Sequence, residues 1–225
     1  MQAKIDFSAE LIQLRTTTIS DAFYKLKPPA STGGYIPDLS LVAGAQKLAG
    51  PVFPVKFAYK SADTAATKQH FVDACPSNSI LLLCPPNDAT NACLGGLLAT
   101  AAAAKSIRGV VANGRVRDLD ELEDCGLTVY AKGTSVCGQS PFLVPVQTGE
   151  PVDITHANGH TITIKAGDYL SADRNGVIVV DFGRLDEIQR IGSESESVDD
   201  FCRQALLKGA GVKETFAKYR GKSKL

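Results

Sequence analysis

The sequence predicts one α/β domain over residues 1–225, built on a mixed β-sheet and ending in a C-terminal helix. Helical and extended patterns alternate in the first half of the chain, whereas short strands and turns dominate from about residue 141. A chain of 225 residues with 44% hydrophobic residues can bury one ordinary core. We expect residues 184–225 to form a helical extension of this domain.

The elements of the N-terminal part follow from periodicity and from proline. Apolar residues recur at helical spacing over residues 8–26, which predicts a helix, and IPDLSLVAG is expected to be irregular. The stretch KLAGPVFPVKFA predicts an extended segment near a sheet edge, because Pro51 and Pro54 cannot donate ladder hydrogen bonds. A helix is expected over residues 61–74, followed by a buried strand at 79–84.

The middle of the chain alternates more regularly. The alanine-rich residues 95–106 predict a helix, and residues 109–112 form the centre of another apolar strand. The stretch DLDELEDCG predicts a short polar helix that ends at Gly126, and TVYAK predicts the next strand.

Hairpins and charged helices are expected in the last third. VDITHANGHTITI predicts a hairpin whose Asn-Gly pair suits a type I′ turn, and DYLSADRNGVIVV predicts two further strands in which Asp168 and Asp173 serve turns. Helices are expected over residues 184–191 and 195–219. The acidic run of the second helix should lie near its start, where the helix dipole favours negative charge; it comprises Glu194, Glu196, Asp199 and Asp200.

Composition excludes several classes of protein. Lys plus Arg and Asp plus Glu each number 24, and this zero net charge argues against bulk binding of nucleic acid or of an anionic membrane. No apolar run approaches the roughly 20 residues of a membrane span, and the N-terminal sequence is unlike a signal peptide. The six cysteines contain no C-x-x-C pair, which indicates free thiols in a reducing compartment and therefore a cytoplasmic protein.

The segment GGLLATAAAAKSIRGVVANGRVRD, residues 95–118, predicts a site by its geometry. Its helix advances about 15 Å at about 1.5 Å per residue. The following strand of about six residues returns about 20 Å. If the helix packs antiparallel to the strand, Gly95 and Gly96 lie close to Arg117 and Asp118 at one edge of the fold.

These residue types suit a small carboxylate and a metal ion. The first amides of a helix have no intrahelical acceptor, and glycine lets a ligand approach the backbone closely. Arg117 can bind a carboxylate with two hydrogen bonds, and Asp118 offers a hard oxygen ligand for Mg²⁺ or Mn²⁺. The alternative is an ordinary turn before the helix and a solvated Arg-Asp loop after the strand.

Lysine and histidine offer weaker candidates. Lys132 in YAKG could form a Schiff base in a desolvated pocket, but a salt bridge or anion contact is the more ordinary role. His156 and His160 could bind zinc, yet solvated side chains of a hairpin explain them as well. His70, within an expected helix, is interpreted as structural.

GGLLATAAAAKSIRGVVANGRVRDLDEL followed by VYAKGTS resembles the family of class II 4-hydroxy-4-methyl-2-oxoglutarate aldolases and oxaloacetate decarboxylases, which includes the regulator of ribonuclease activity A. The family motif is a glycine-containing loop, about twenty residues, and then R-D-x-x-E/D, here Arg117, Asp118 and Glu121. TTTISDAFYKL, QHFVDACPSNSILLL and GDYLSADRNGVIVV extend the resemblance over roughly residues 14–183. GGYIPDL and the charged C-terminal helix look more like fungal members.

The resemblance implies a swivelling β/β/α-type fold and a homotrimer or homohexamer with active sites shared between subunits. It implies a lyase that decarboxylates oxaloacetate or cleaves 4-hydroxy-4-methyl-2-oxoglutarate to pyruvate. Arg117 and Glu121 would be catalytic, and Asp118 would hold Mg²⁺ or Mn²⁺. The substrate, a small 2-oxo acid, would be bound by Arg117 and by the backbone of Gly95, Gly96, Leu97 and Leu98. The alternative is a non-enzymatic regulator that binds a protein, like the ribonuclease regulators of the family.

Two departures from the family pattern affect this expectation. Many bacterial aldolases of this type carry an aspartate where this chain has Gly96, so proton handling should differ here. They also take a glutamate from the C-terminal region of a neighbouring subunit. Several residues could fill that role and the sequence does not choose among them, namely Glu187, Glu194, Glu196 and Glu214.

Overall fold

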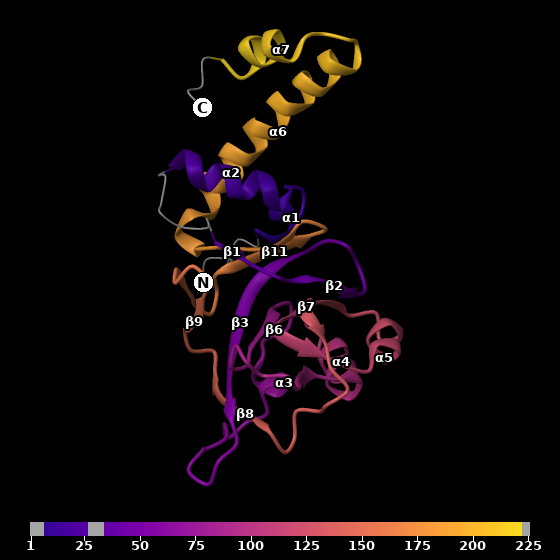
Figure 1. Cartoon of the computed structure of the whole chain (residues 1–225), viewed down its shortest axis with the longest axis vertical. Helices are drawn as coiled ribbons and strands as arrows, with labels where there is room; N and C mark the ends of the chain where they lie inside the picture. Colours follow the sequence, from indigo (N-terminus) through magenta and orange to yellow (C-terminus); the bar gives the residue numbers. More distant parts are fainter. Residues whose placement is uncertain (1–6, 27–33, 222–225) are drawn as a thin grey trace, which may run out of the picture.

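The computed structural model describes residues 7–26 and 34–221 (Figure 1). The chain forms a mixed α/β domain whose main sheet runs in the order β1-β12-β11-β3-β4-β6-β7-β2, with β5 beside β6 and β8 beside β3. The strands of this sheet are β1 (Tyr35–Ile36), β2 (Ser40–Ala43), β3 (Leu48–Tyr59), β4 (Ile80–Cys84), β5 (Ala92–Leu94), β6 (Gly109–Val116), β7 (Thr128–Thr134), β8 (Leu143–Thr148), β11 (Tyr169–Asp173) and β12 (Gly176–Val180). β9 (Val152–Thr155) and β10 (Thr161–Ile164) form a separate hairpin.

The centre of the sheet is parallel and is covered on both faces. β3, β4, β6 and β7 run parallel to one another, and β4 is buried along its whole length, as its apolar sequence predicts. Leu81 and Leu83 pack on one face with α3 (Phe71–Ala74), α4 (Gly96–Ala104) and α5 (Leu119–Asp124). Ile80 and Leu82 pack on the other face with the apolar side chains of the β9–β10 hairpin.

β3 is not an edge strand, so that prediction was wrong. Its first part pairs with β11, its middle with β4 and its last part with β8. Pro51 stands where pairing passes from β11 to β4, where its missing N–H breaks no continuous ladder. The Pro54 carbonyl accepts a hydrogen bond from the Gly149 amide at 2.9 Å. Changing partners therefore accommodates both prolines in a central strand.

The predicted helix over residues 8–26 is two helices, α1 (Ser8–Leu11) and α2 (Thr16–Leu26). Asp173, in the turn between β11 and β12, accepts hydrogen bonds from the Thr16 backbone amide at 2.9 Å and from the Thr16 hydroxyl at 2.8 Å. This carboxylate caps the start of α2, and the local periodicity could not reveal it. Asp173 and Asp168 both serve turns, as predicted: Asp168 accepts from the Lys165 amide at 2.8 Å.

Three other local predictions were wrong. IPDLSLVAG contributes β1 and β2, and residues 61–74 form a loop with only the short helix α3 at its end. The β9–β10 turn is not type I′, because Gly159 has a positive φ and Asn158 does not. The Gly159 amide instead donates to the His156 carbonyl at 2.9 Å.

The C-terminal helices are α6 (Leu185–Leu207) and α7 (Val212–Tyr219), so the break predicted near residue 193 does not exist. Gly192 lies inside α6, where a Cβ atom would approach Leu14 to 2.7 Å, and it serves close packing instead of ending the helix. The acidic run is consequently in the middle of α6. α6 and α7 extend away from the sheet, at the opposite end of the molecule from α4 and α5 (Figure 1). Within the described residues, every helix is too short or too polar to span a bilayer.

Candidate functional site

The start of α4 and the end of β6 meet, as the sequence predicts. The Arg117 amide donates to the Leu94 carbonyl at 3.0 Å, which holds the end of β6 beside the loop that leads into α4. The Gly96 amide donates to Asp118 Oδ2 at 3.1 Å, and Arg117 Nε lies 3.3 Å from the same oxygen. The helix N-terminus, the guanidinium and the carboxylate therefore form one contiguous cluster.

The glycine pair is needed for this contact. A Cβ atom on Gly95 would lie 2.6 Å from Asp118 Oδ2 and 3.2 Å from Arg117 Nε. A Cβ atom on Gly96 would overlap the carboxylate of Glu121, which reaches back from the first turn of α5. Glu121 thus occupies the space into which any side chain at position 96 would extend.

Asp118 has a left-handed backbone conformation with φ of 59°. Aspartate tolerates this region better than most residues, because its short polar side chain can bond locally. The turn reverses the chain after β6 and starts α5, so that Glu121 faces α4. A tight αL turn thereby brings three charged residues, Arg117, Asp118 and Glu121, against the same two glycines.

Gly138 is a neighbour of the cluster that the sequence did not indicate. A Cβ atom there would lie 2.6 Å from Arg117 Nη1, so the guanidinium packs directly on this backbone. The segment is fixed by bonds from Asn91 Nδ2 to the Gly138 carbonyl at 3.0 Å and from the Ala92 amide to the Cys137 carbonyl at 2.8 Å. Contacts between residues as far apart in the sequence as Asn91 and Gly138, which are separated by 47 positions, leave no local sequence signal.

The cluster remains accessible. The Arg117 and Asp118 side chains are 43% and 36% exposed, and Leu97 is 83% exposed. Leu97 and Leu98 lie in the first turn of α4, where amides have no intrahelical acceptor, while the Gly96 amide is engaged by Asp118. Leu98 also packs its side chain on the core. An anion that approaches Arg117 would find these two amides beside it.

The surroundings of Asp118 suit an ion such as Mg²⁺, which needs few ligands from the protein, better than an ion that needs three or more protein ligands. No group of three His, Cys, Asp or Glu residues lies together anywhere in residues 7–26 and 34–221. Mg²⁺ usually keeps several waters and takes only one or two carboxylates from the protein. An exposed aspartate with a glutamate close by is compatible with that kind of ion.

The C-terminal glutamates belong to helices that extend away from the cluster in the same chain. Glu187, in the first turn, Glu194 and Glu196 belong to α6 and Glu214 belongs to α7, and these helices run away from the sheet on the side opposite α4 (Figure 1). Glu196 accepts hydrogen bonds from the Arg15 amide at 3.0 Å and from the Thr18 hydroxyl at 2.9 Å, which ties α6 to α2. Glu194 pairs with Arg190 at 3.0 Å.

The histidines differ from expectation in one respect. His70 is structural: its Nδ1 accepts from the Val72 amide at 3.3 Å and caps α3. His156 is buried, not solvated, and its Nε2 has no hydrogen-bond partner among the residues that the structure describes. Burial lowers the pKa of His156, with smaller contributions from the charges of His160 and Lys132.

The cysteines are free thiols, and four of the six are buried, Cys75, Cys84, Cys93 and Cys202. Burial raises the pKa of Cys75, Cys84 and Cys93 to about 12, so these thiols are protonated at neutral pH. Structural packing, as predicted, is their role.

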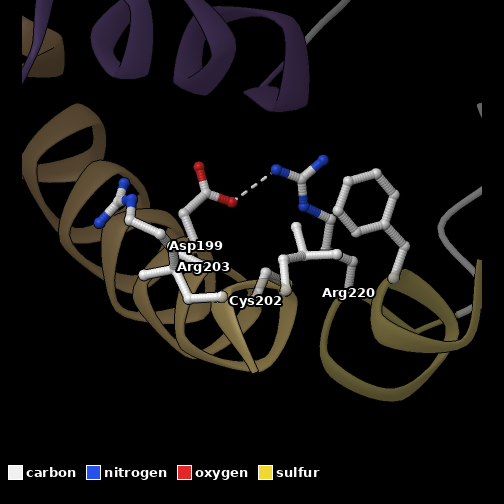
Figure 2. A pocket seen from close by; sticks show the side chains of 7 residues that line it. Asp199, Cys202, Arg203 and Arg220 are labelled. Atoms are coloured by element: carbon white, nitrogen blue, oxygen red, sulfur yellow. Dashed lines mark hydrogen bonds and ion pairs between the residues drawn. The ribbon is translucent and has the colours of Figure 1, made fainter. Parts of the chain in front are cut away.

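Among the cavities formed by the described residues, two lie outside the cluster. The first encloses about 390 Å³ between α6 and α7, with the Asp199–Arg220 ion pair at 2.6 Å across it (Figure 2). Apolar side chains of both helices line it, and it is remote from Arg117. The second, of about 140 Å³, lies at the ends of β6 and β7 and is lined by Lys132 among others.

The chain belongs to the RraA-like family described as Aldolase/RraA, whose model matches residues 16–179. A protein from Halalkalibacterium halodurans named "Putative 4-hydroxy-4-methyl-2-oxoglutarate aldolase" is 24% identical over 91% of this chain and 90% of its own length. Protein DlpA of Legionella pneumophila is 24% identical over 93% of this chain, which spans only 33% of DlpA.

Solved structures confirm the fold. RraAS2 of Streptomyces coelicolor, titled an unusual member of the RNase ES inhibitor RraA protein family, superposes with a TM-score of 0.75 at 23% identity, over 88% of this chain and 95% of that one. An uncharacterized protein from Pseudomonas syringae gives a TM-score of 0.77 at 20% identity, over 92% and 95% of the two chains. The predicted mixed α/β class and the family resemblance are both confirmed.

Proposed function

We propose that the protein is a divalent-metal-dependent carbon–carbon lyase that acts on pyruvate-derived 2-oxo acids. The observation that carries the proposal is the contact of Arg117, Asp118 and Glu121 with the exposed N-terminus of α4. The aldolase names of several relatives support the same class of reaction. Oxaloacetate decarboxylation and cleavage of 4-hydroxy-4-methyl-2-oxoglutarate both leave the electron pair of the broken bond on a pyruvate enolate.

Arg117 would hold the substrate carboxylate. Its guanidinium is fixed by packing on Gly138 and by Asp118, which leaves further N–H groups to donate. The amides of Leu97 and Leu98 would bind the same carboxylate at the positive end of α4. This pairing would orient the 2-oxo group toward Asp118.

Asp118, with Glu121 beside it, would hold Mg²⁺ or Mn²⁺, which would supply Lewis-acid stabilisation of the negative charge that develops as the bond breaks. Arg117 would hold the substrate carboxylate, and the Gly96 amide positions Asp118 by its hydrogen bond. The αL turn at Asp118 keeps the side chains of Arg117 and Asp118 on the same side of the chain.

Glu121 would handle the proton. Related bacterial enzymes carry an aspartate at the position of Gly96. A Cβ atom on Gly96 would overlap the Glu121 carboxylate, so this carboxylate lies where the side chain of such an aspartate would begin. A positioned carboxylate can deliver or accept a proton directly or through one water. In decarboxylation, CO₂ leaves and the enolate carbon takes one proton; in aldol cleavage, a hydroxyl proton must also be removed.

We also propose that the active protein is a homotrimer or hexamer. The helices α6 and α7 extend away from the sheet on the side opposite α4 and α5 (Figure 1), so a glutamate of these helices could reach the site only from a neighbouring copy. Sedimentation should report a threefold multiple of the 23.8 kDa chain.

The test is pyruvate release from oxaloacetate and from 4-hydroxy-4-methyl-2-oxoglutarate, with Mg²⁺, with Mn²⁺ and with excess EDTA. We expect turnover that EDTA abolishes and added metal restores. Turnover unaffected by EDTA would contradict metal dependence, and no turnover of either compound would contradict the lyase.

A protein-binding regulator is the second candidate. Exposed apolar side chains on α6 and α7 favour it, with Phe201 56% and Leu207 82% exposed. Two solved structures that share the fold are titled as an RNA-processing inhibitor, RraA, and as an unusual member of the RNase ES inhibitor RraA protein family. Absence of lyase activity together with inhibition of a ribonuclease would favour this role.

A further inference from the structure

The segment between β7 and β8, residues 135–142, contains no helix or strand and lies against Arg117. Its start is fixed by the Ser135 amide, which donates to the Val116 carbonyl at 2.9 Å. An irregular segment keeps one position where other parts of the chain satisfy its backbone groups. The position of this segment beside Arg117 therefore depends on the contacts that its middle makes.

Two consecutive residues hold two consecutive carbonyls of this segment. Asn91 Nδ2 donates to the Gly138 carbonyl at 3.0 Å, and the Ala92 amide donates to the Cys137 carbonyl at 2.8 Å. The bond from Ala92 joins backbone to backbone, so it does not depend on the side chain at position 92. The bond from Asn91 does depend on its side chain, and the identity of residue 91 therefore decides how the Gly138 carbonyl is held.

The side chain of Asn91 is buried, and the residue is only 9% exposed. Burying an amide group costs free energy that a hydrogen bond must offset, whereas an apolar side chain of similar size could fill the same space without a partner. Packing alone consequently does not explain an asparagine before β5. The hydrogen bond to Gly138 does.

Gly138 transmits the position of this segment to Arg117. A Cβ atom on Gly138 would lie 2.6 Å from Nη1, 3.0 Å from Cζ and 3.4 Å from Nη2 of Arg117, so the end of the guanidinium lies directly against this backbone. At the other edge of the guanidinium, Nε lies 3.3 Å from Asp118 Oδ2. The Nη groups are the donors that remain for a substrate carboxylate, and the Gly138 backbone limits where they can lie.

We propose that Asn91 is a positioning residue for the Arg117 guanidinium and acts through the Gly138 backbone. The inference rests on the proposed function, in which Arg117 binds the carboxylate of a 2-oxo acid. Two parallel hydrogen bonds to a carboxylate require the guanidinium to lie in one plane with it, and a small displacement weakens both. Without the bond from Asn91, the Gly138 backbone can move and the Nη groups can turn about the contact between Nε and Asp118.

Asn91→Leu removes the donor and keeps a side chain of similar volume. The carboxylate contact exists both before and during bond cleavage, so weakening it should raise KM and leave kcat nearly unchanged. We expect KM for oxaloacetate to rise about fivefold, the scale of one lost hydrogen bond. The Kd of oxalate, measured by calorimetry with Mn²⁺ present, should rise by the same factor, while the Kd of Mn²⁺ stays the same. Wild-type values of KM and of oxalate affinity in Asn91→Leu would overturn the proposal.

Two further variants separate positioning from stability. Asn91→Ala removes the same donor but leaves a cavity, so it should lower the thermal unfolding midpoint more than Asn91→Leu does and weaken oxalate binding by the same factor. Tyr130→Phe is the matched control, because it removes another hydrogen bond from a side chain to a distant carbonyl, that of Gln46 at 2.6 Å. It should leave oxalate binding unchanged. Oxalate affinity that follows the unfolding midpoint across the three variants would show a merely structural role and overturn the proposal.

Gly138→Ala reaches Arg117 without changing Asn91. The φ of Gly138 lies outside the left-handed region, so alanine fits the backbone, and its Cβ atom would displace Nη1. Oxalate binding should weaken. Adding Asn91→Leu should weaken it by less than the product of the two single effects, because both changes act on one guanidinium. Two fully independent effects would contradict the proposed route from Asn91 through Gly138.

Arg117→Lys distinguishes failure of this inference from failure of the proposed function. If Arg117→Lys binds oxalate as tightly as wild type, Arg117 does not bind the substrate carboxylate, and the proposed function and this inference both fail. If Arg117→Lys weakens oxalate binding and Asn91→Leu does not, only the positioning role of Asn91 fails. Because both comparisons measure binding, they do not depend on turnover.

Discussion

The two faces of the central sheet carry polar groups in different ways. On the helical face, Arg117, Asp118 and Glu121 contact one another or the glycines of α4. On the hairpin face, Asn113 and His156 each bury a polar atom that finds no hydrogen-bond partner within residues 7–26 and 34–221. The helical cluster is assembled within 27 residues of chain, from Gly95 to Glu121, whereas the hairpin face draws on four strands and a distant hairpin.

This difference predicts which substitutions should change activity and which should change stability. The helical cluster is partly exposed and internally paired, so changing it should affect activity more than folding. The hairpin face lies in the core, so changing it should affect stability and its pH dependence. Four predictions test this contrast, beginning with the largest effect.

Asp118→Asn should lower kcat/KM for oxaloacetate at least about a hundredfold, in the range seen when a preorganised electrostatic contact is lost. Asparagine also tolerates the αL conformation, so the fold should be retained. Steady-state kinetics with Mn²⁺ and a thermal unfolding curve check both points.

Asp120→Asn is the matched control, because Asp120 is an exposed acid in the same turn. It should leave kcat/KM unchanged. Full activity of Asp118→Asn would show that the metal is held elsewhere.

Arg117→Lys keeps the charge but loses the planar pair of donors. A charge-assisted contact of this kind is worth about 2–3 kcal/mol, or about 30- to 150-fold in kcat/KM. Oxalate, a planar dicarboxylate, should bind more weakly by a similar factor, while Mn²⁺ binding persists. Calorimetry measures each binding separately, with Arg190→Lys on α6 as the control. If Arg117→Lys binds oxalate as tightly as wild type, Arg117 does not bind the substrate carboxylate and the Arg-Asp pair is only a surface turn.

Gly96→Ala should displace the Glu121 carboxylate, because the new Cβ atom overlaps it. Because Glu121 is exposed and can move, we expect kcat to fall only about tenfold. A positioned acid or base contributes roughly 10²–10⁴ in rate, so this loss would be a part of that contribution. The double variant Gly96→Asp with Glu121→Ala should exceed Glu121→Ala alone, because it restores a carboxylate. If the double variant is no better, the two positions do not exchange roles.

The sequence predicts the helical face well because its signals are local. The alanine run, the glycine pair and Arg117-Asp118 lie in one helix–strand unit whose lengths alone bring them together. The buried strand β4 and the strand after α4 were predicted for the same reason. The family match over residues 16–179 places the same segment in its wider fold.

Long-range contacts explain what the sequence could not predict. The Asp173 cap that divides α1 from α2 lies 157 positions away from Thr16. The prolines of β3 indicated an edge, but a strand that changes partners accommodates them. Two separate helices were expected over residues 184–191 and 195–219, yet α6 runs through that gap and Gly192 packs against Leu14. The surroundings of Gly138 and Asn113 could not be predicted, because they depend on segments that are distant in the sequence and meet only in the folded sheet.

His156 gives the smallest expected effect and tests the hairpin face directly. Burial, with the charges of His160 and Lys132, lowers the pKa of His156 below its ordinary value, so the folded state holds the proton less tightly than the unfolded chain. The stability due to the neutral ring is therefore complete above the unfolded pKa of about 6.5. It falls as the pH drops through that value toward the lower folded pKa, and it is constant below. Urea unfolding at pH 8.0 and pH 5.5 should show wild type losing more stability than His156→Gln, whereas His160→Gln should keep most of the loss. An equal loss in wild type and His156→Gln would mean that the ring gains its proton without cost, and the hairpin face would then be as tolerant of charge as the face that carries Arg117.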